Sequence, residues 1–312
     1  MNDATPKTES SWIAPLLYLL GAGSLVGVMT NLAKLAGEVG LSPLAFLTWS
    51  AGGATLVLLV LNYFRGDLPK LNARTVEYFL TSGLVTVALT NLIFFAATPR
   101  LGAGFVALAI TLPPLTTYAG SLLVGLESFR WSRAVGVLLS LGGAALLAYY
   151  KLSDPEADTF WIVMVLVAVL GLTAGNIYRT TRWPEGAEAA ELAPGMIGAA
   201  FLQLLVFGTL AAVFGWNPDL FSLGIDFSQP DQLYVIGGQI AVYATQLILF
   251  FRLQKTGGPV YLSLLGSVGA IVGVPVAVLL LGENWPEGLV IGGLLIAAGI
   301  GLLTYGGAHQ ED

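Results

Sequence analysis

The sequence predicts an all-α polytopic membrane protein with ten transmembrane helices, built as two inverted five-helix repeats, with both the N- and C-termini cytoplasmic. Hydrophobic residues make up 56% of the 312 residues and charged residues only 10%, whereas soluble domains carry about 25% charged residues. The apolar runs are continuous and about 20 residues long, the length that a helix needs to cross a hydrocarbon core. A shift of 156 positions also overlays residues 78–149 on residues 234–305 without a gap.

The first repeat, residues 12–150, should contain five helices bounded by polar or turn-forming residues. They are expected at residues 12–33, 43–64, 76–98, 102–124 and 131–150. A loop, residues 151–158, connects this repeat to the second one, residues 159–306. The helices of the second repeat are expected at residues 159–178, 193–214, 232–253, 259–281 and 286–305.

The remaining segments are short. The longest loop, residues 215–231, contains Asn217, Pro218 and Pro230, which predict an ordered, turn-rich connection. Residues 1–11 and 307–312 are expected to be cytoplasmic tails, and the first helix is expected to be retained rather than removed as a signal peptide.

The distribution of lysine and arginine predicts the orientation, because cytoplasmic loops are enriched in these residues. With the N-terminus inside, ten basic residues face the cytoplasm and three face outside. The inner ones are Lys7, Arg65, Lys70, Arg74, Arg130, Arg133, Arg179, Arg182, Arg252 and Lys255, and the outer ones are Lys34, Arg100 and Lys151. Five helices per repeat is an odd number, so the two copies must lie in opposite orientations, an arrangement typical of transporters.

Missing residue types argue against several classes of function. The chain has no cysteine, and its one histidine, His309, lies in the C-terminal tail. We therefore expect no metal, no cofactor and no enzymatic activity. The net charge of −6 is spread without a basic block, so no nucleic-acid partner is expected. The expected partners are the lipid bilayer and a small-molecule substrate, and the protein is expected to be a monomer or a homodimer.

No ionisable residue falls near the middle of any predicted helix, although such residues normally mark coupling sites and proton relays. The candidate substrate-binding residues are instead neutral and polar or aromatic. They are Ser24, Asn31, Tyr78, Ser82, Thr90, Asn91, Thr111, Asn176, Gln239, Tyr243, Gln246 and Ser263. Each could also form an ordinary interhelical hydrogen bond, worth about 0.6 kcal/mol, and Tyr78 could belong to an interfacial aromatic belt.

Two of the predicted helices carry residues that interrupt a helix near its centre. The segment 102–124 contains Pro113 and Pro114, and the aligned part of the segment 259–281 contains Gly269, Gly273 and Pro275. Interrupted segments at matching places in two halves indicate a binding site at the membrane midplane. We expect these five residues to act as hinges, and the alternative is an ordinary kink satisfied by neighbouring helices.

These features resemble the drug/metabolite transporter superfamily, and its EamA branch in particular. Residues 125–127 (Gly-Leu-Glu), followed by a helix with Gly136 and Gly143, are similar to the repeat-end pattern of that branch, and residues 281–283 (Leu-Gly-Glu) repeat the pattern. The chain as a whole looks most like the bacterial YddG-type exporters of aromatic amino acids.

The resemblance implies a central cavity walled by the first, third, fourth, sixth, eighth and ninth helices, with the fifth and tenth at the periphery. It also implies alternating access in the inner (plasma) membrane and export of aromatic or hydrophobic amino acids and related metabolites. Because the cavity should lack a strong charge partner, we expect weak affinity and facilitated, gradient-driven movement. One alternative is an exporter of lipophilic drugs or cations, and a second is a membrane scaffold or receptor without transport.

Overall fold

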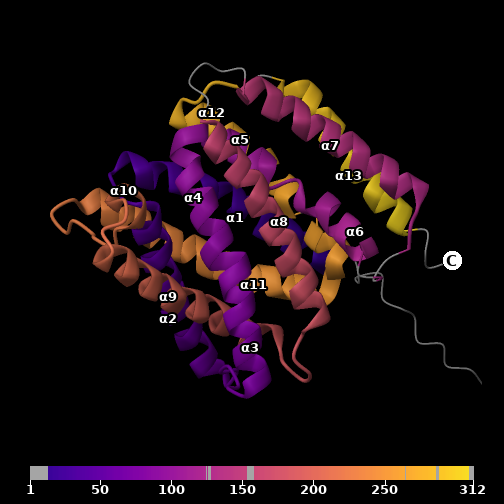
Figure 1. Ribbon diagram of the computed structural model, residues 1–312. Helices are drawn as coiled ribbons and strands as arrows, with labels where there is room; N and C mark the ends of the chain where they lie inside the picture. Colours follow the sequence, from indigo (N-terminus) through magenta and orange to yellow (C-terminus); the bar gives the residue numbers. More distant parts are fainter. Residues whose placement is uncertain are drawn as a thin grey trace, which may run out of the picture.

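The computed structural model describes residues 13–123, 125, 128–152, 158–263, 265–285 and 288–308. These residues form helices joined by short loops, with no strand among them (Figure 1). Seven helices within these ranges are long and apolar enough to cross a membrane. The structure is therefore that of a polytopic helical membrane protein, as the composition predicts, while the count of ten spans stays a prediction.

The first half of the chain departs twice from the predicted regular helices. Its elements are α1 (Ile13–Glu38), α2 (Pro43–Arg65), α3 (Ala73–Ser82), the π-helix η1 (Gly83–Leu89), α4 (Thr90–Leu101), α5 (Ala103–Ala109), α6 (Pro113–Leu123) and α7 (Trp131–Leu152). The third predicted helix thus contains a π-helical stretch, and the fourth is broken at residues 110–112. Pro113 and Pro114 form the first turn of α6, where the missing N–H groups of proline have no helical partner in any case.

The second half differs from the prediction at residues 254–258, which were expected to be a loop. Its elements are α8 (Thr159–Thr181), α9 (Ala189–Val213), α10 (Pro218–Phe221), α11 (Pro230–Ser263), α12 (Leu265–Leu281) and α13 (Leu289–Ala308). The helix α11 runs through 254–258 without a break, so the expected loop is wrong. Glycine and proline are only a weak guide to helix ends, because tertiary context overrides local propensity.

The helices α1 and α12 pack through glycines at very short range. A Cβ atom added to Gly27 would lie 2.4 Å from the carbonyl oxygen of Gly269 and 2.7 Å from the nitrogen of Gly273. The helix α12 passes through both glycines and Pro275 without interruption. The predicted break in this segment is therefore wrong at these residues, since the glycines allow two backbones to approach closely rather than bend the helix.

The break between α5 and α6 lies against α12. A Cβ atom on Gly266 would lie 1.8 Å from the carbonyl oxygen of Ile110, so only glycine leaves room for the carbonyl at the break. Ile110 and Gly266 are 156 residues apart, which is the shift that relates the two predicted repeats, so equivalent places of these repeats are in contact.

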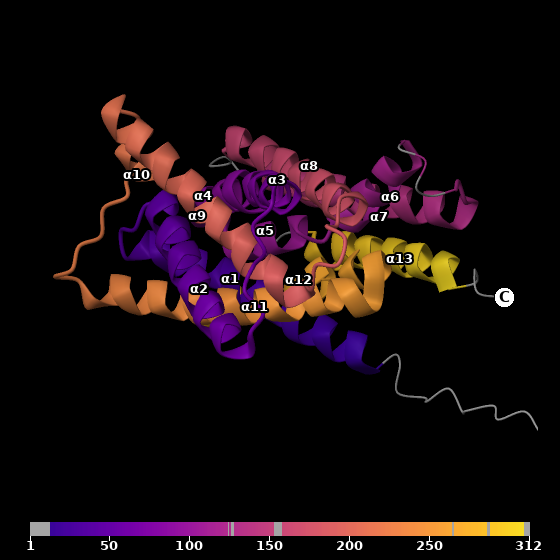
Figure 2. The ribbon, with the colours of Figure 1, turned by 90° about the horizontal axis from the view of Figure 1, so that it is seen from below.

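The helices α7 and α13 lie side by side at one edge of the molecule (Figure 1, Figure 2). The Ser140 hydroxyl donates to the Ile296 carbonyl oxygen at 3.2 Å, across a separation of 156 residues. The contact is reciprocal: a Cβ atom on Gly143 would lie 2.6 Å from the Gly292 oxygen, and one on Gly299 would lie 2.4 Å from the Gly136 oxygen. The two helices form a peripheral pair, as the resemblance implies.

One end of the bundle is held by a half-buried ionic cluster. The Glu283 carboxylate accepts from the backbone N–H groups of Ala103 at 2.7 Å and Gly104 at 3.1 Å, and Lys34 Nζ lies 3.0 Å from it. The carboxylate thus caps the N-terminus of α5, which has no capping side chain of its own, and ties it to α1 and to the loop after α12.

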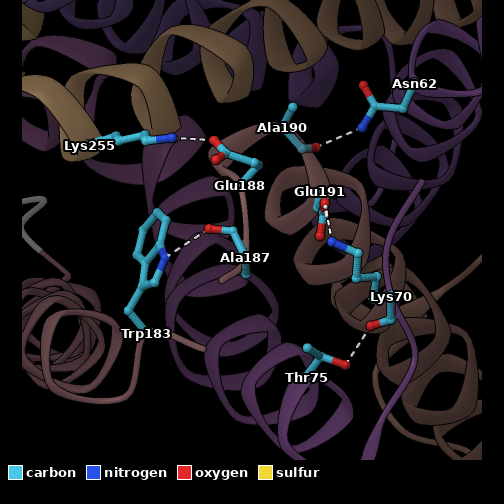
Figure 3. Close-up of polar contacts among 9 residues, drawn as sticks. All are labelled: Asn62, Lys70, Thr75, Trp183, Ala187, Glu188, Ala190, Glu191 and Lys255. Atoms are coloured by element: carbon cyan, nitrogen blue, oxygen red, sulfur yellow. Dashed lines mark hydrogen bonds and ion pairs between the residues drawn. The ribbon is translucent and has the colours of Figure 1, made fainter. Parts of the chain in front are cut away.

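The connection between α8 and α9 carries a second polar cluster, shown in Figure 3. Lys70 Nζ lies 3.0 Å from Glu191 Oε1, Lys255 pairs with Glu188, and Asn62 donates to the Ala190 carbonyl oxygen at 2.6 Å. These contacts join α9 to α2, to the loop before α3, and to α11. In the predicted topology this cluster is cytoplasmic and the Glu283 cluster is on the outer side.

Substitution of Gly27 with alanine should lower the thermal midpoint of the detergent-purified protein, because the added methyl group overlaps the α12 backbone. Overpacking of this kind costs about 1–3 kcal/mol. Gly142→Ala is the matched control, since a Cβ atom there meets nothing within 4 Å. Equal midpoints for the two variants would show that the α1–α12 contact is loose.

Substitution of Glu283 with alanine should also lower the thermal midpoint, because it leaves the backbone N–H groups of Ala103 and Gly104 without an acceptor. Each unpaired buried donor lowers the stability of the folded state by about 1–3 kcal/mol. Glu38→Ala serves as the control, because Glu38 also faces Lys34, at 3.9 Å, but its side chain is 52% exposed against 12% for Glu283. An exposed ion pair contributes about 0–1 kcal/mol. A larger effect of Glu38→Ala would contradict the capping role.

Candidate functional site

A cavity of about 160 Å³ lies where the two halves of the chain meet. Its walls come from α1, η1, α4, the α5–α6 break, α8, α11 and the start of α12, with Met196 from α9. These are the helices that the resemblance implies, apart from α9. The lining is mostly apolar and includes three phenylalanines, Phe94, Phe95 and Phe250. A mostly apolar concave site with a few polar groups is typical of a small-molecule site.

The π-helix η1 shapes one wall of this cavity. It contributes Thr86 and Val87 to the lining, and π-helical turns are frequently found at functional sites. The Thr90 hydroxyl donates to the Val85 carbonyl oxygen, five residues earlier, at 2.6 Å. On the facing helix α8, a Cβ atom on Gly175 would lie 1.7 Å from Thr86 Cγ2, so glycine is required for α8 to pack here.

Four of the predicted substrate-binding residues line the cavity: Asn91, Asn176, Tyr243 and Gln246. The Asn91 Nδ2 atom donates to the Tyr243 hydroxyl at 2.8 Å, which links α4 to α11. Within the described part of the chain, the structure gives the Gln246 amide no hydrogen bond, although its side chain is only 7% exposed. Its donors and acceptor are therefore available to a molecule in the cavity.

Arg179 also lines the cavity, and sequence reasoning missed it as a site residue. It lies in the last turn of α8 and is 3% exposed, rather than in the cytoplasmic aqueous phase where the charge count placed it. Its Nη2 atom donates to Asn176 Oδ1 at 2.7 Å, and its Cζ atom lies 5.0 Å from the centre of the Phe250 ring. The expectation that the cavity offers no strong charge partner is therefore wrong. Asn176 and Arg179 are three residues apart and therefore lie on one helix face. This spacing is the feature of the sequence that could have assigned Arg179 to the cavity.

Four other predicted site residues are absent from the cavity lining and donate hydrogen bonds to backbone carbonyl oxygens. Asn31 is buried and donates to the carbonyl oxygens of Gly27 at 2.8 Å and Gly273 at 3.0 Å, which ties α1 to α12. Ser82, Thr90 and Thr111 donate to carbonyl oxygens of their own segments.

Three further residues, Tyr78, Gln239 and Ser24, also lie apart from the cavity lining. Tyr78 stacks on Tyr178 with ring centres 6.1 Å apart, and it is 1% exposed. Gln239 is fully buried, and Ser24 is partly buried on α1. The side chain of Ser263 lies outside the described part. Of the predicted hinges, only Pro113 lines the cavity. A role of these residues in transport stays a prediction.

The chain is similar to known proteins over most of its length. Residues 13–149 match the EamA-like transporter family. Two WAT1-related proteins of Arabidopsis thaliana are each 22% identical to this chain. The first match covers 87% of this chain and 83% of the relative, and the second covers 98% and 94%. A solved crystal structure is 16% identical, with a TM-score of 0.61 over 97% of this chain and 98% of that one, so it shares the fold.

The family match thus relates residues 13–149 of this chain to a group of transporters. The relatives are plant WAT1-related proteins and not bacterial YddG-type exporters. The superfamily and EamA resemblance is thus supported, whereas the YddG-type assignment gains no support from them.

Substitution of Gln246 with alanine should reduce counterflow of labelled phenylalanine in proteoliposomes by several-fold, because it removes an amide that faces the cavity. Thr245→Ala is the control, since Thr245 is exposed on the same helix and its hydroxyl bonds only to the Ala241 carbonyl oxygen. Equal counterflow by the two variants would remove Gln246 from the site.

Proposed function

We propose that this protein is an alternating-access transporter that exports aromatic or hydrophobic amino acids and related small metabolites by facilitated movement. The observation that carries the proposal is the small cavity between the two halves, which has an aromatic wall and a few polar groups. An aromatic wall suits a large apolar side chain, and the amides of Asn91 and Gln246 supply oxygens that can accept from an ammonium group.

The charge of the cavity argues against the alternative of a drug or cation exporter. The one charged side chain that lines it in the described part of the chain is Arg179, which would repel a cation. A scaffold without transport would leave the cavity and the broken helix beside it without a role.

The proposed architecture is two inverted five-helix repeats, ten spans in all. The reciprocal glycine contacts between α7 and α13 and the meeting of Ile110 with Gly266 support it, because each joins equivalent places in the two copies. Alternating access would then rock one repeat against the other around the cavity. The two polar clusters, around Glu283 and around Glu188 and Glu191, would separate in turn as each side opens.

The proposed location is the inner (plasma) membrane with both termini cytoplasmic, supported by the ten-to-three bias of basic residues. The apolar, glycine-lined surfaces of α7 and α13 leave both a monomer and a homodimer within the proposal. Facilitated movement is supported by the cavity lining, which includes no aspartate or glutamate among the described residues, since a central carboxylate is the usual coupling group.

Uptake of labelled phenylalanine into proteoliposomes should therefore run down its own gradient without an imposed pH difference. The rate should be unchanged when the pH is equal on both sides and a protonophore is added. A strict requirement for a pH gradient would contradict the facilitated mechanism.

A counterflow panel of amino acids, sugars and cationic drugs should separate the candidate functions. We expect exchange with phenylalanine, tryptophan and leucine, and none with sugars or quaternary ammonium drugs. Exchange with the cationic drugs alone would favour the alternative exporter. Absence of counterflow for the whole panel, with folded protein in the liposomes, would favour a scaffold or receptor.

A further inference from the structure

The most unusual group in the membrane part of this chain is the buried guanidinium of Arg179. It lies at the end of α8, where a long basic side chain normally extends toward water. Here the residue is 3% exposed, so the charge is turned into the protein and lies against the cavity.

Within the described residues, the protein surrounds this charge with neutral groups and gives it no counter-ion. No ion pair among the described residues includes Arg179, and its Nε atom is buried without a hydrogen-bond partner. The ring of Phe250 and the oxygen of Asn176 are its neutral partners. A buried charge without a counter-ion is costly, and an anion bound beside the guanidinium would lower that cost.

The neighbouring amide adds further donors. Arginine can only donate hydrogen bonds, so the Asn176 atom that it contacts must be the oxygen. The two N–H groups of that amide remain, together with the guanidinium, and both side chains line the cavity. This end of the cavity therefore offers donors, a positive charge and no carboxylate from the described chain, which is the chemistry that recognises a carboxylate.

We propose that Arg179, supported by Asn176, binds the carboxylate of the transported molecule and makes the carboxylate the group that the cavity selects. This inference rests on the proposed transport function and names its substrate class: small monocarboxylates with an aromatic or branched apolar body. The body lies against the phenylalanine wall, beginning at the Phe250 ring beside the guanidinium. An ammonium group is accommodated by the amides of Asn91 and Gln246 and is not required.

Four probes that share one ring separate the groups that matter: phenylalanine, 3-phenylpropanoate, phenylalaninamide and phenylethylamine. We expect phenylalanine and 3-phenylpropanoate to raise the thermal midpoint of the full-length purified protein and to compete with labelled phenylalanine in counterflow. Phenylalaninamide and phenylethylamine should bind at least about tenfold more weakly, the size expected of hydrogen bonds to a charged group. Equal binding of phenylethylamine and phenylalanine would overturn the proposal without use of any variant.

Variants assign the selectivity to the guanidinium. Arg179→Gln should lower the ratio of the affinities for phenylalanine and phenylethylamine by at least about tenfold. Arg179→Lys should keep part of this preference, because lysine retains the charge but lacks the planar fork of the guanidinium. Arg182→Gln is the matched control, since Arg182 is exposed three residues further along. An unchanged preference in folded Arg179→Gln would overturn the proposal.

The outcomes also separate this inference from the proposed function. If 3-phenylpropanoate binds in an Arg179-dependent way but no amino acid exchanges, the amino acid export fails and the carboxylate site stands. If amino acids exchange but the carboxylate is dispensable, the function stands and the carboxylate site fails.

Discussion

The close approach of α1 to α12 is the contact on which the rest of the structure depends. A side chain on Gly27 would overlap the α12 backbone, and Cβ atoms on Gly269 and Gly273 would lie 3.3 Å and 3.1 Å from the nearest α1 backbone atoms. The two helices therefore meet at a distance that Gly27 in particular permits. In lipid there is little hydrophobic gain from bringing helices together, and such close backbone packing is a main source of association. Because α1 belongs to the first half and α12 to the second, this contact sets where the halves meet. The bonds of Asn31 to Gly27 and Gly273 hold the same seam.

Two irregular segments line the cavity beside that seam. The π-helix η1 and the break between α5 and α6 both interrupt the regular backbone beside the cavity, and both pack against a glycine on a facing helix, Gly175 and Gly266 respectively. Irregular backbone at membrane depth is tolerated where it is buried in protein or lines a cavity, and here it does both. The charge of Arg179 is placed where one of these helices, α8, ends.

Sequence reasoning reached most of the helical segments, but it misread several residues. The predicted segments 43–64 and 131–150 agree closely with α2 and α7, since long apolar runs with polar ends indicate a membrane helix strongly. The sequence pattern indicates a break at the glycines of α12, whereas the helix is continuous there and packs closely on α1. The sequence does not show whether a glycine bends its own helix or lets another helix approach. Asn91, Asn176, Tyr243 and Gln246 were found as cavity residues from their polarity, whereas Arg179 was missed because the charge count assigned it to the aqueous side.

The sequence by itself determined the class of protein: continuous apolar runs can only be satisfied as helices in a bilayer, since each backbone polar group must be paired within its own segment. The sequence also predicts a duplication, because residues match at a shift of 156 positions. Only the tertiary structure decided which polar groups face the cavity, where the helix breaks, and that Arg179 is buried. Those properties depend on the neighbours that surround each side chain. The spacing of residues along a helix shows which of them share a face, but it does not show which other helix packs against that face.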